Sequence, residues 1–171
     1  DNGVAYAALG ATSDIVGRDG TVYRTGVTSQ SKGIAIIDLS EPNALRTVKV
    51  LSLTSAVRRV KKAGTRLYAA AGGDGLLELD VSLPASAAVV RSRALQGARD
   101  VVVADGLAFV ADDSGVAIVD LSRFVVAGRI TISGGANAVA LRRGQLVVGT
   151  ASVVAPEVRI YDVRNANWAE L

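Results

Sequence analysis

Four aspartates recur along the chain at intervals of 42, 40 and 42 residues, each at the end of a short apolar segment: Asp38, Asp80, Asp120 and Asp162. Repeated carboxylates of this kind could bind metal ions or transfer protons. They could also be structural, because an aspartate that ends a strand accepts hydrogen bonds from backbone N–H groups of the following turn. One aspartate per repeat cannot converge on a single site, so we favour the structural interpretation.

Two acidic turns, Gly73–Gly75 and Asp112–Gly115, loosely resemble calcium-binding loops. A calcium site needs six to eight oxygen ligands from a loop of defined spacing. Neither segment has the spacing of an EF-hand or of a Gly-Gly-x-Gly-x-Asp repeat. We therefore favour plain turns between strands over calcium sites.

Histidine and cysteine are absent from all 171 residues. Their absence excludes a Ser–His–Asp triad, disulfides and thiolate chemistry, and it removes the commonest metal ligand. The sequence also contains no Gly-x-Ser-x-Gly elbow and no phosphate-binding glycine loop. We expect no bound cofactor or metal and no catalytic residues.

The charge pattern is mild, with a net charge of +3 and no long basic run. This balance favours an ordinary surface over one that binds polyanions, so we expect no nucleic-acid partner. No stretch of about 18 uninterrupted apolar residues occurs, so we expect no membrane insertion.

The aspartates close four copies of one segment: GIAIIDLS at Gly33–Ser40, GLLELDVS at Gly75–Ser82, GVAIVDLS at Gly115–Ser122 and EVRIYDVR at Glu157–Arg164. A period of about 40 residues built from short strands is typical of β-propeller blades, which are four-stranded antiparallel sheets with strands A to D from axis to rim. The repeat predicts an all-β fold of about four blades, with about fifteen strands and essentially no helix. The expected blades are residues 1–53, 54–95, 96–132 and 133–171.

The third repeat shows the four strands most clearly, as Ala98–Ala104, Leu107–Ala111, Gly115–Leu121 and Phe124–Ile132. Glycines Gly64, Gly106 and Gly144 align in the A–B turns, where a tight hairpin requires positive φ. The first blade lacks its strand A, and a strand D near Asn167–Leu171 is doubtful. We therefore expect part of a larger ring, completed by additional blades or another chain.

Two departures from the repeat fall between strands B and C: Gly10–Lys32 in the first blade and Ala151–Pro156 in the fourth. Within the first, Thr21–Thr28 could form a small hairpin. Chain direction places B–C loops and D–A connections on one face, which we call the B–C face. Candidate binding residues there are Asp14, Arg18, Asp19, Tyr23 and Arg24 in the insertion and Arg99 and Asn137 near the axis. The axial residues could also simply form the solvated mouth of the channel.

The second blade carries charges where the other blades are apolar. On alignment of the A–B glycines, Arg59 corresponds to Val101 and Lys61 to Val103. On alignment of the strand-C aspartates, Glu78 corresponds to Ile118. Unpaired charges facing a neighbouring blade are costly. We expect either an ion pair from Glu78 to Arg59 or Lys61 across the Ala69–Ala71 segment, or a face open to water or to a partner.

The strand-C segments, from Ile34–Asp38 to Val158–Asp162, resemble the LVIVD repeat, a bacterial and archaeal propeller family. The resemblance covers nearly the whole chain apart from Gly10–Lys32. It implies a propeller, commonly in exported or surface proteins, and no shared catalytic residues.

The expected function is therefore a non-catalytic interaction or scaffold module of a bacterial exported, surface or periplasmic protein. It would bind a protein or a glycan through the B–C face. The alternative is a propeller enzyme, such as a hydrolase, a lyase or a quinoprotein-type oxidoreductase, with its site on the central axis. A third possibility is a purely structural repeat in a large surface or filament protein.

Overall fold

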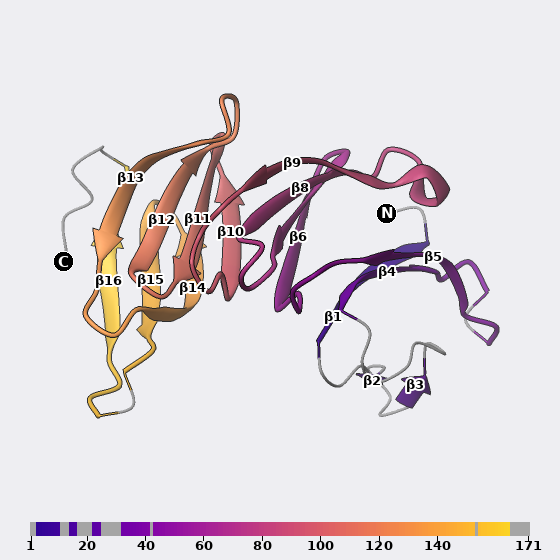
Figure 1. Cartoon of the computed structure of the whole chain (residues 1–171), viewed down its shortest axis with the longest axis horizontal. Coiled ribbons are helices and arrows are strands. Elements are labelled where there is room, and N and C mark those ends of the chain that lie inside the picture. The colour runs from indigo at the N-terminus through magenta and orange to yellow at the C-terminus, as the bar shows by residue number, and fades with distance from the viewer. Residues whose placement is uncertain are drawn as a thin grey trace.

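Four antiparallel sheets lie side by side in chain order in the computed structural model, which describes residues 3–10, 14–16, 22–24, 32–41, 43–152 and 154–164 (Figure 1). Each sheet is one predicted blade, and the all-β propeller prediction is confirmed. The first blade contains β1 (Val4–Leu9), β4 (Gly33–Asp38) and β5 (Arg46–Ser52). The second contains β6 (Arg59–Ala63), β7 (Arg66–Ala70), β8 (Leu76–Asp80) and β9 (Ala88–Arg93).

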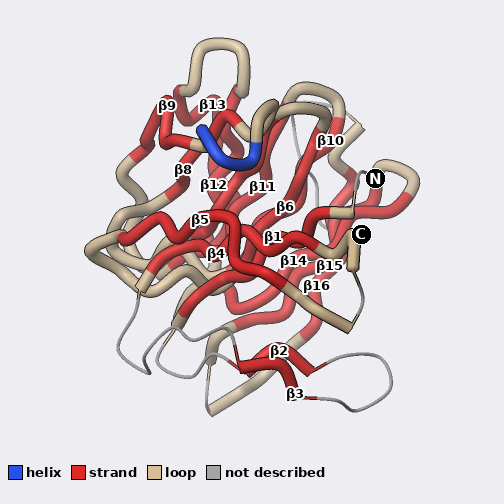
Figure 2. The backbone as a smooth tube through the Cα atoms, turned by 90° about the vertical axis from the view of Figure 1, so that its right-hand side faces the viewer, coloured by secondary structure: helices blue, strands red, loops and turns tan. Residues whose placement is uncertain are grey.

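The remaining two sheets repeat the same order. The third blade contains β10 (Asp100–Ala104), β11 (Leu107–Asp112), β12 (Gly115–Asp120) and β13 (Val125–Thr131). The fourth contains β14 (Ala136–Arg142), β15 (Gln145–Thr150) and β16 (Val158–Asp162). The inner strand β10 contacts both β6 and β14, which places these strands along the axis. In the described chain, helical structure is limited to the 3-10 turn Pro84–Ser86, blue in Figure 2. No described helix is long and apolar enough to span a membrane.

The glycine that opens strand C has a steric cause. A Cβ on Gly33, Gly75 or Gly115 would come within 1.8 to 2.2 Å of a carbonyl oxygen of strand D or the end of that strand. All three residues also have positive φ. Glycine is therefore required where strands C and D approach each other most closely.

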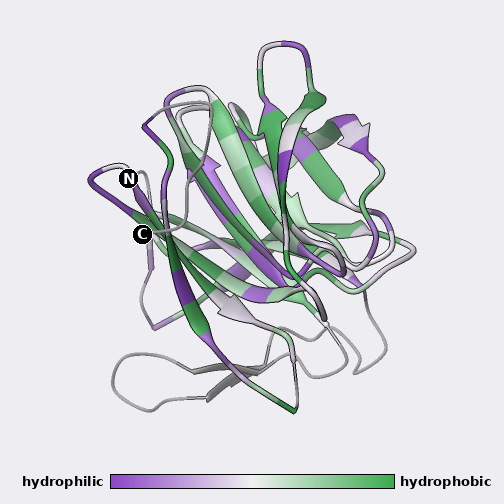
Figure 3. Ribbon diagram, turned by 90° about the vertical axis from the view of Figure 1, so that its left-hand side faces the viewer, coloured by the Kyte–Doolittle hydropathy of each residue, from purple (hydrophilic) through white to green (hydrophobic). Residues whose placement is uncertain are grey.

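In the second and third blades, strands B and C form the core because both of their faces are covered. In β12, Ala117 and Val119 pack toward the second blade, whereas Val116 and Ile118 pack toward the fourth. Strand D at the rim is mostly exposed, as the burial of β13 shows. The hydropathy colours follow this arrangement, with apolar strands and more polar turns (Figure 3).

The A–B turn of the second blade differs from the other two, and this difference corrects the sequence alignment. Gly64 is the first of the two turn residues, between Ala63 and Arg66, whereas Gly106 and Gly144 are second. Aligning the glycines therefore shifts strand A of this blade by one residue. Such a shift moves every side chain to the opposite face.

In the corrected register, Val60 corresponds to Val101 and Lys62 to Val103. Val60 packs against the first blade. Arg59 and Lys61 alternate with these residues along the strand and therefore face the third blade. The predicted equivalence of Arg59 with Val101 and of Lys61 with Val103 is wrong.

The fourth blade presents an open face. Val158 and Ile160 of β16 are 72% and 40% exposed, whereas the equivalent Val116 and Ile118 of β12 are fully buried against the fourth blade. The face therefore has the apolar character of a blade–blade contact without a described neighbour. This agrees with the expectation of a partial ring.

The long insertion interrupts an otherwise ordinary hairpin. Leu9 pairs directly with Gly33, just as Asp112 pairs with Gly115 across a two-residue turn in the third blade. Within the insertion, β2 (Asp14–Val16) pairs with β3 (Val22–Arg24). Of the predicted hairpin within Thr21–Thr28, the structure describes only Val22–Arg24, and this strand pairs with the upstream strand β2. The rest of that segment lies outside the described residues. The β2–β3 pair lies apart from the four sheets (Figure 2).

Candidate functional site

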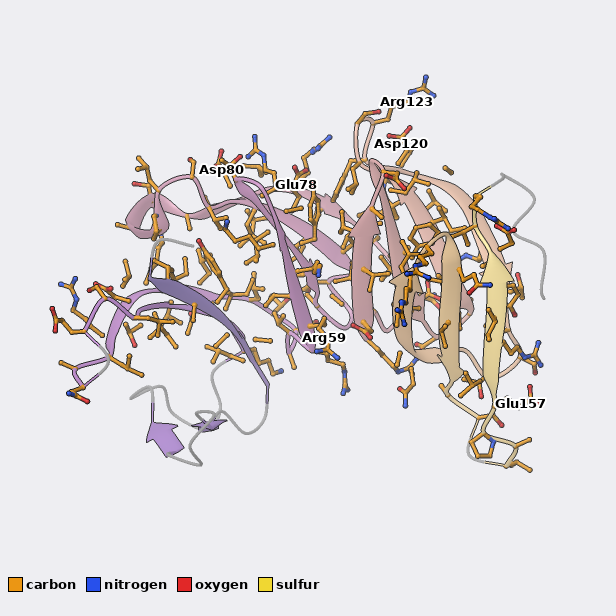
Figure 4. All side chains as sticks on the ribbon, turned by 180° about the vertical axis from the view of Figure 1, so that it is seen from behind. Arg59, Glu78, Asp80, Asp120, Arg123 and Glu157 are labelled. Atoms are coloured by element: carbon orange, nitrogen blue, oxygen red, sulfur yellow. The ribbon has the colours of Figure 1, made fainter. Side chains whose placement is uncertain are left out.

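The four strand-C aspartates are structural, as the sequence predicted. Each accepts a hydrogen bond from the backbone N–H two residues later, from Ser40, Ser82, Ser122 and Arg164 respectively, at 2.8 to 3.0 Å. The Arg46 guanidinium and the Ser40 N–H lower the pKa of Asp38 to about 2. Arg164 lowers the pKa of Asp162 to about 2 in the same way. These carboxylates fix the C–D turns. Asp80 and Asp120 lie at the opposite end of their blades from Arg59 and Glu157 (Figure 4).

The B–C face contains a polar hollow of about 800 Å³ between the second and third blades. The D–A connection Ala94–Gly97 forms one wall, and the B–C turn Asp112–Ser114 forms the other. The Asp113 N–H donates to the Gln96 carbonyl at 3.0 Å, which holds the two segments together. The predicted grouping of B–C loops with D–A connections on one face is therefore confirmed at this site.

Both acidic side chains of this hollow are held by arginines. Arg129 Nη1 donates to both oxygens of the buried Asp112 at 2.7 and 2.8 Å. Arg99 Nη2 pairs with Asp113, and its Nη1 donates to the Ala136 carbonyl at 3.2 Å. The B–C turn of the third blade is thus fixed by two ion pairs within the blade, and Arg99 adds a hydrogen bond to the fourth blade. Asp74, in the other acidic turn, instead accepts hydrogen bonds from Thr54 and Ser55.

Gln96 and Ser114 are the groups in this hollow that offer hydrogen bonds to a ligand. Both are exposed, and neither side chain bonds another described residue. An amide and a hydroxyl between neutralised carboxylates suit hydrogen bonding to peptide groups or sugar hydroxyls. With each described carboxylate of the hollow paired to an arginine, the site offers no obvious general base.

Asp100 links three blades near the axis. Its Oδ1 accepts from Arg59 Nε of the second blade at 2.9 Å, and its Oδ2 accepts from the Val139 N–H of the fourth at 3.0 Å. It is 6% exposed. No sequence motif indicates this role of Asp100, because its partners are 41 and 39 residues away.

The predicted binding residues are only partly brought together. Arg99 reaches the Ala136 carbonyl and so lies beside the exposed Asn137 at the axial end of the B–C face. Asp14 and Arg24 are cross-strand partners, and Tyr23 is the partner of Ile15, in the β2–β3 hairpin. Arg18 and Asp19 lie outside the described residues. In Figure 1, β2 and β3 lie at the same end of the molecule as the β15–β16 loop.

The buried Glu78 has different partners from those expected. It pairs with Arg91 on β9 and with Arg66 on β7, at 3.6 Å for the latter. Tyr68 lies between Glu78 and Lys61 in the sheet register, so the aromatic ring of Tyr68 separates Glu78 from Lys61. Arg59 bonds Asp100 instead. The predicted bridge from Glu78 to Arg59 or Lys61 is therefore wrong.

Arg91 also ties the second blade to the third. It donates to the carbonyls of Leu121 and Ser122 at 2.8 and 3.1 Å, and its guanidinium lies 4.8 Å from the centre of the Phe124 ring. Arg93 donates to the Phe124 carbonyl. The charges of the second blade therefore serve contacts between blades.

Comparison with known proteins supports the repeat and the fold. Residues 97–123 match the family model of the LVIVD repeat, so the third blade carries such a repeat. No curated protein sequence matches the chain.

Solved structures resemble the chain at low identity. Sqt1 from Saccharomyces cerevisiae is 9% identical with a TM-score of 0.67, over 82% of this chain and 41% of that one. The Pan2 WD40 domain from Neurospora crassa is 14% identical with a TM-score of 0.64, over 88% and 54%. A europium-containing methanol dehydrogenase is 15% identical with a TM-score of 0.55, over 68% and 25%.

The chain spans 54% or less of each of these three structures. At such identities the likeness establishes the fold and leaves the activity open. The chain is a partial β-propeller that carries an LVIVD repeat.

Proposed function

We propose that the chain is a non-catalytic interaction module that binds a protein or a glycan through its B–C face. The observation that carries this proposal is the hollow between the second and third blades. Its two carboxylates are neutralised by Arg129 and Arg99, while Gln96 and Ser114 remain exposed. Such a surface offers hydrogen bonds and a hollow that a ligand can fit, without a reactive group.

The two loop departures extend the same face. The short loop from Ala151 to Pro156 contacts the D–A connection, because the Ala151 N–H donates to the Gly135 carbonyl at 3.0 Å. The insertion adds β2 and β3 at this end (Figure 1). Loops that depart from a repeat on one face commonly carry the specificity of the module. The resemblance to LVIVD propellers supports a location outside the cytoplasm, on the surface or in the periplasm of a bacterium.

Two variants test the proposal. In one, Gly-Asp-Gly replaces Gly10–Lys32, and the fold should survive because Leu9 already pairs with Gly33. In the other, Gln96→Ala is combined with Ser114→Ala. The control is Arg123→Gln, which lies on a C–D turn at the opposite end of the blades (Figure 4).

Binding is measured on a glycan array and by cross-linking mass spectrometry in a bacterial surface-protein extract. We expect both variants to lose at least tenfold in affinity for the partner, and Arg123→Gln to keep it. Cross-links should map to the B–C face. A partner that binds both variants as well as the native chain, or cross-links confined to the A–B turns, would contradict the proposal.

A further inference from the structure

A small cavity of about 140 Å³ lies between the first and second blades, at the end opposite the B–C face. Tyr6 of β1 and Lys62 of β6 line it, together with the A–B turn residues Gly64 and Thr65 and the C–D turn residue Ser82. Since one water occupies about 30 Å³ in the liquid, the cavity has room for a small polyatomic ion with a few waters.

Lys62 is out of place in the repeat. In the observed register, its equivalents are Val103 and Leu141, which pack against neighbouring residues of the core. A lysine therefore stands where the other blades direct an apolar side chain toward the preceding blade. No described acidic residue forms an ion pair with Lys62. Lys61 on the same strand adds to the positive potential.

Two other polar groups of the cavity, the hydroxyls of Tyr6 and Thr65, supply donors. The Tyr6 hydroxyl carries a proton that it can donate, and burial raises its pKa further. The Thr65 hydroxyl is exposed and bonds no other described residue. The Ser82 hydroxyl already donates to Asp80 at 2.7 Å. Asp80 itself is neutralised by Arg66 at 2.7 Å, which limits its repulsion of an anion.

We propose that this cavity binds a tetrahedral oxyanion, namely a phosphate or sulfate group. An ammonium and separate hydroxyls approach from different directions, which suits tetrahedral oxygens better than the planar fork of a carboxylate. Among the described residues, no arginine, the residue best matched to a carboxylate, lines the cavity. The apolar walls Val4, Val81 and Pro84 strengthen the attraction by excluding water. This site is separate from the B–C face and does not depend on the function proposed above.

The test is a titration of the full chain with inorganic phosphate, followed by amide chemical shifts at constant ionic strength. We expect millimolar binding, with the largest shifts at Gly64, Thr65 and Ser82. Lys62→Gln should weaken binding at least tenfold, and Tyr6→Phe about threefold to tenfold. Lys61→Gln is the matched control, because it removes the same charge one residue away on the opposite face of β6 and should change the affinity less than threefold. The amide spectra also report whether each variant is folded.

Parallel titrations with sulfate and acetate define the ligand class. Sulfate should shift the same amides, whereas acetate at the same concentration should shift them little. The proposal is overturned if phosphate leaves Gly64, Thr65 and Ser82 unshifted, or if Lys61→Gln loses as much affinity as Lys62→Gln. It is also overturned if acetate binds as tightly as phosphate, since the cavity would then select charge alone.

Discussion

The buried carboxylate of Asp100 on β10 accepts a hydrogen bond from Arg59 Nε on β6 at 2.9 Å, across the boundary between the second and third blades. The same carboxylate accepts the Val139 N–H of the fourth blade at 3.0 Å. One side chain therefore joins three consecutive blades at the axis, where their inner strands share no ladder of hydrogen bonds.

Removing the Asp100 carboxylate should destabilise the packing of these three blades. We expect Asp100→Ala to lower the free energy of unfolding by about 1–3 kcal/mol, because the Val139 N–H loses its acceptor and Arg59 its partner. Urea denaturation measures the change. Glu41→Ala, at an exposed turn position, should change stability by less than about 0.5 kcal/mol. Equal effects of the two substitutions would show that the link between blades is energetically unimportant.

The ion pair between Glu78 and Arg91 should be strongly coupled. A double-mutant cycle with Glu78→Gln and Arg91→Gln should give a coupling energy of about 1–3 kcal/mol, because Glu78 is buried. The exposed pair Glu157–Arg159 is the matched comparison and should give about 0.2–1 kcal/mol. A smaller coupling for Glu78–Arg91 than for the exposed pair would mean that Arg91 acts only through its contacts with the third blade.

Two glycines of the third blade separate steric from conformational requirements. Gly115→Ala should cost more than about 3 kcal/mol or prevent folding, because its Cβ would meet the Ile130 carbonyl oxygen at 2.2 Å. Gly106→Ala should cost about 1 kcal/mol, because φ is positive but the space around it is open. The melting temperatures of the two variants show which substitution is more destabilising. If Gly115→Ala is the less destabilising substitution, strand C does not require glycine at its first residue for steric reasons.

Acid should weaken the C–D turns. The pKa of Asp38 and that of Asp162 are about 2 in the folded chain, below the ordinary value of 3.8. Their stabilisation is therefore complete above about pH 4 and is lost as the pH falls toward 2. The double variant Asp38→Asn/Asp162→Asn should show a smaller fall in melting temperature between pH 5 and about 2.5. A fall as steep as in the native chain would show that these carboxylates do not control the acid transition.

The sequence by itself determined the features that depend on neighbouring residues. The repeated glycine and aspartate of strand C predicted the strands, the turns and the blades, because each acts within one hairpin. Asp38 and Ser40 show this, since donor and acceptor are two residues apart. The grouping of Arg99 with the B–C face also followed from chain direction alone.

The tertiary structure decided what lies between blades. The position of Gly64 within its turn set the face on which Arg59 and Lys62 lie, and composition gave no sign of that one-residue difference. The partners of Glu78 and Asp100, the polar hollow beside Gln96 and the cavity beside Lys62 all depend on packing between sheets. Such contacts join residues many positions apart in the chain, and their geometry is fixed only when the blades stack.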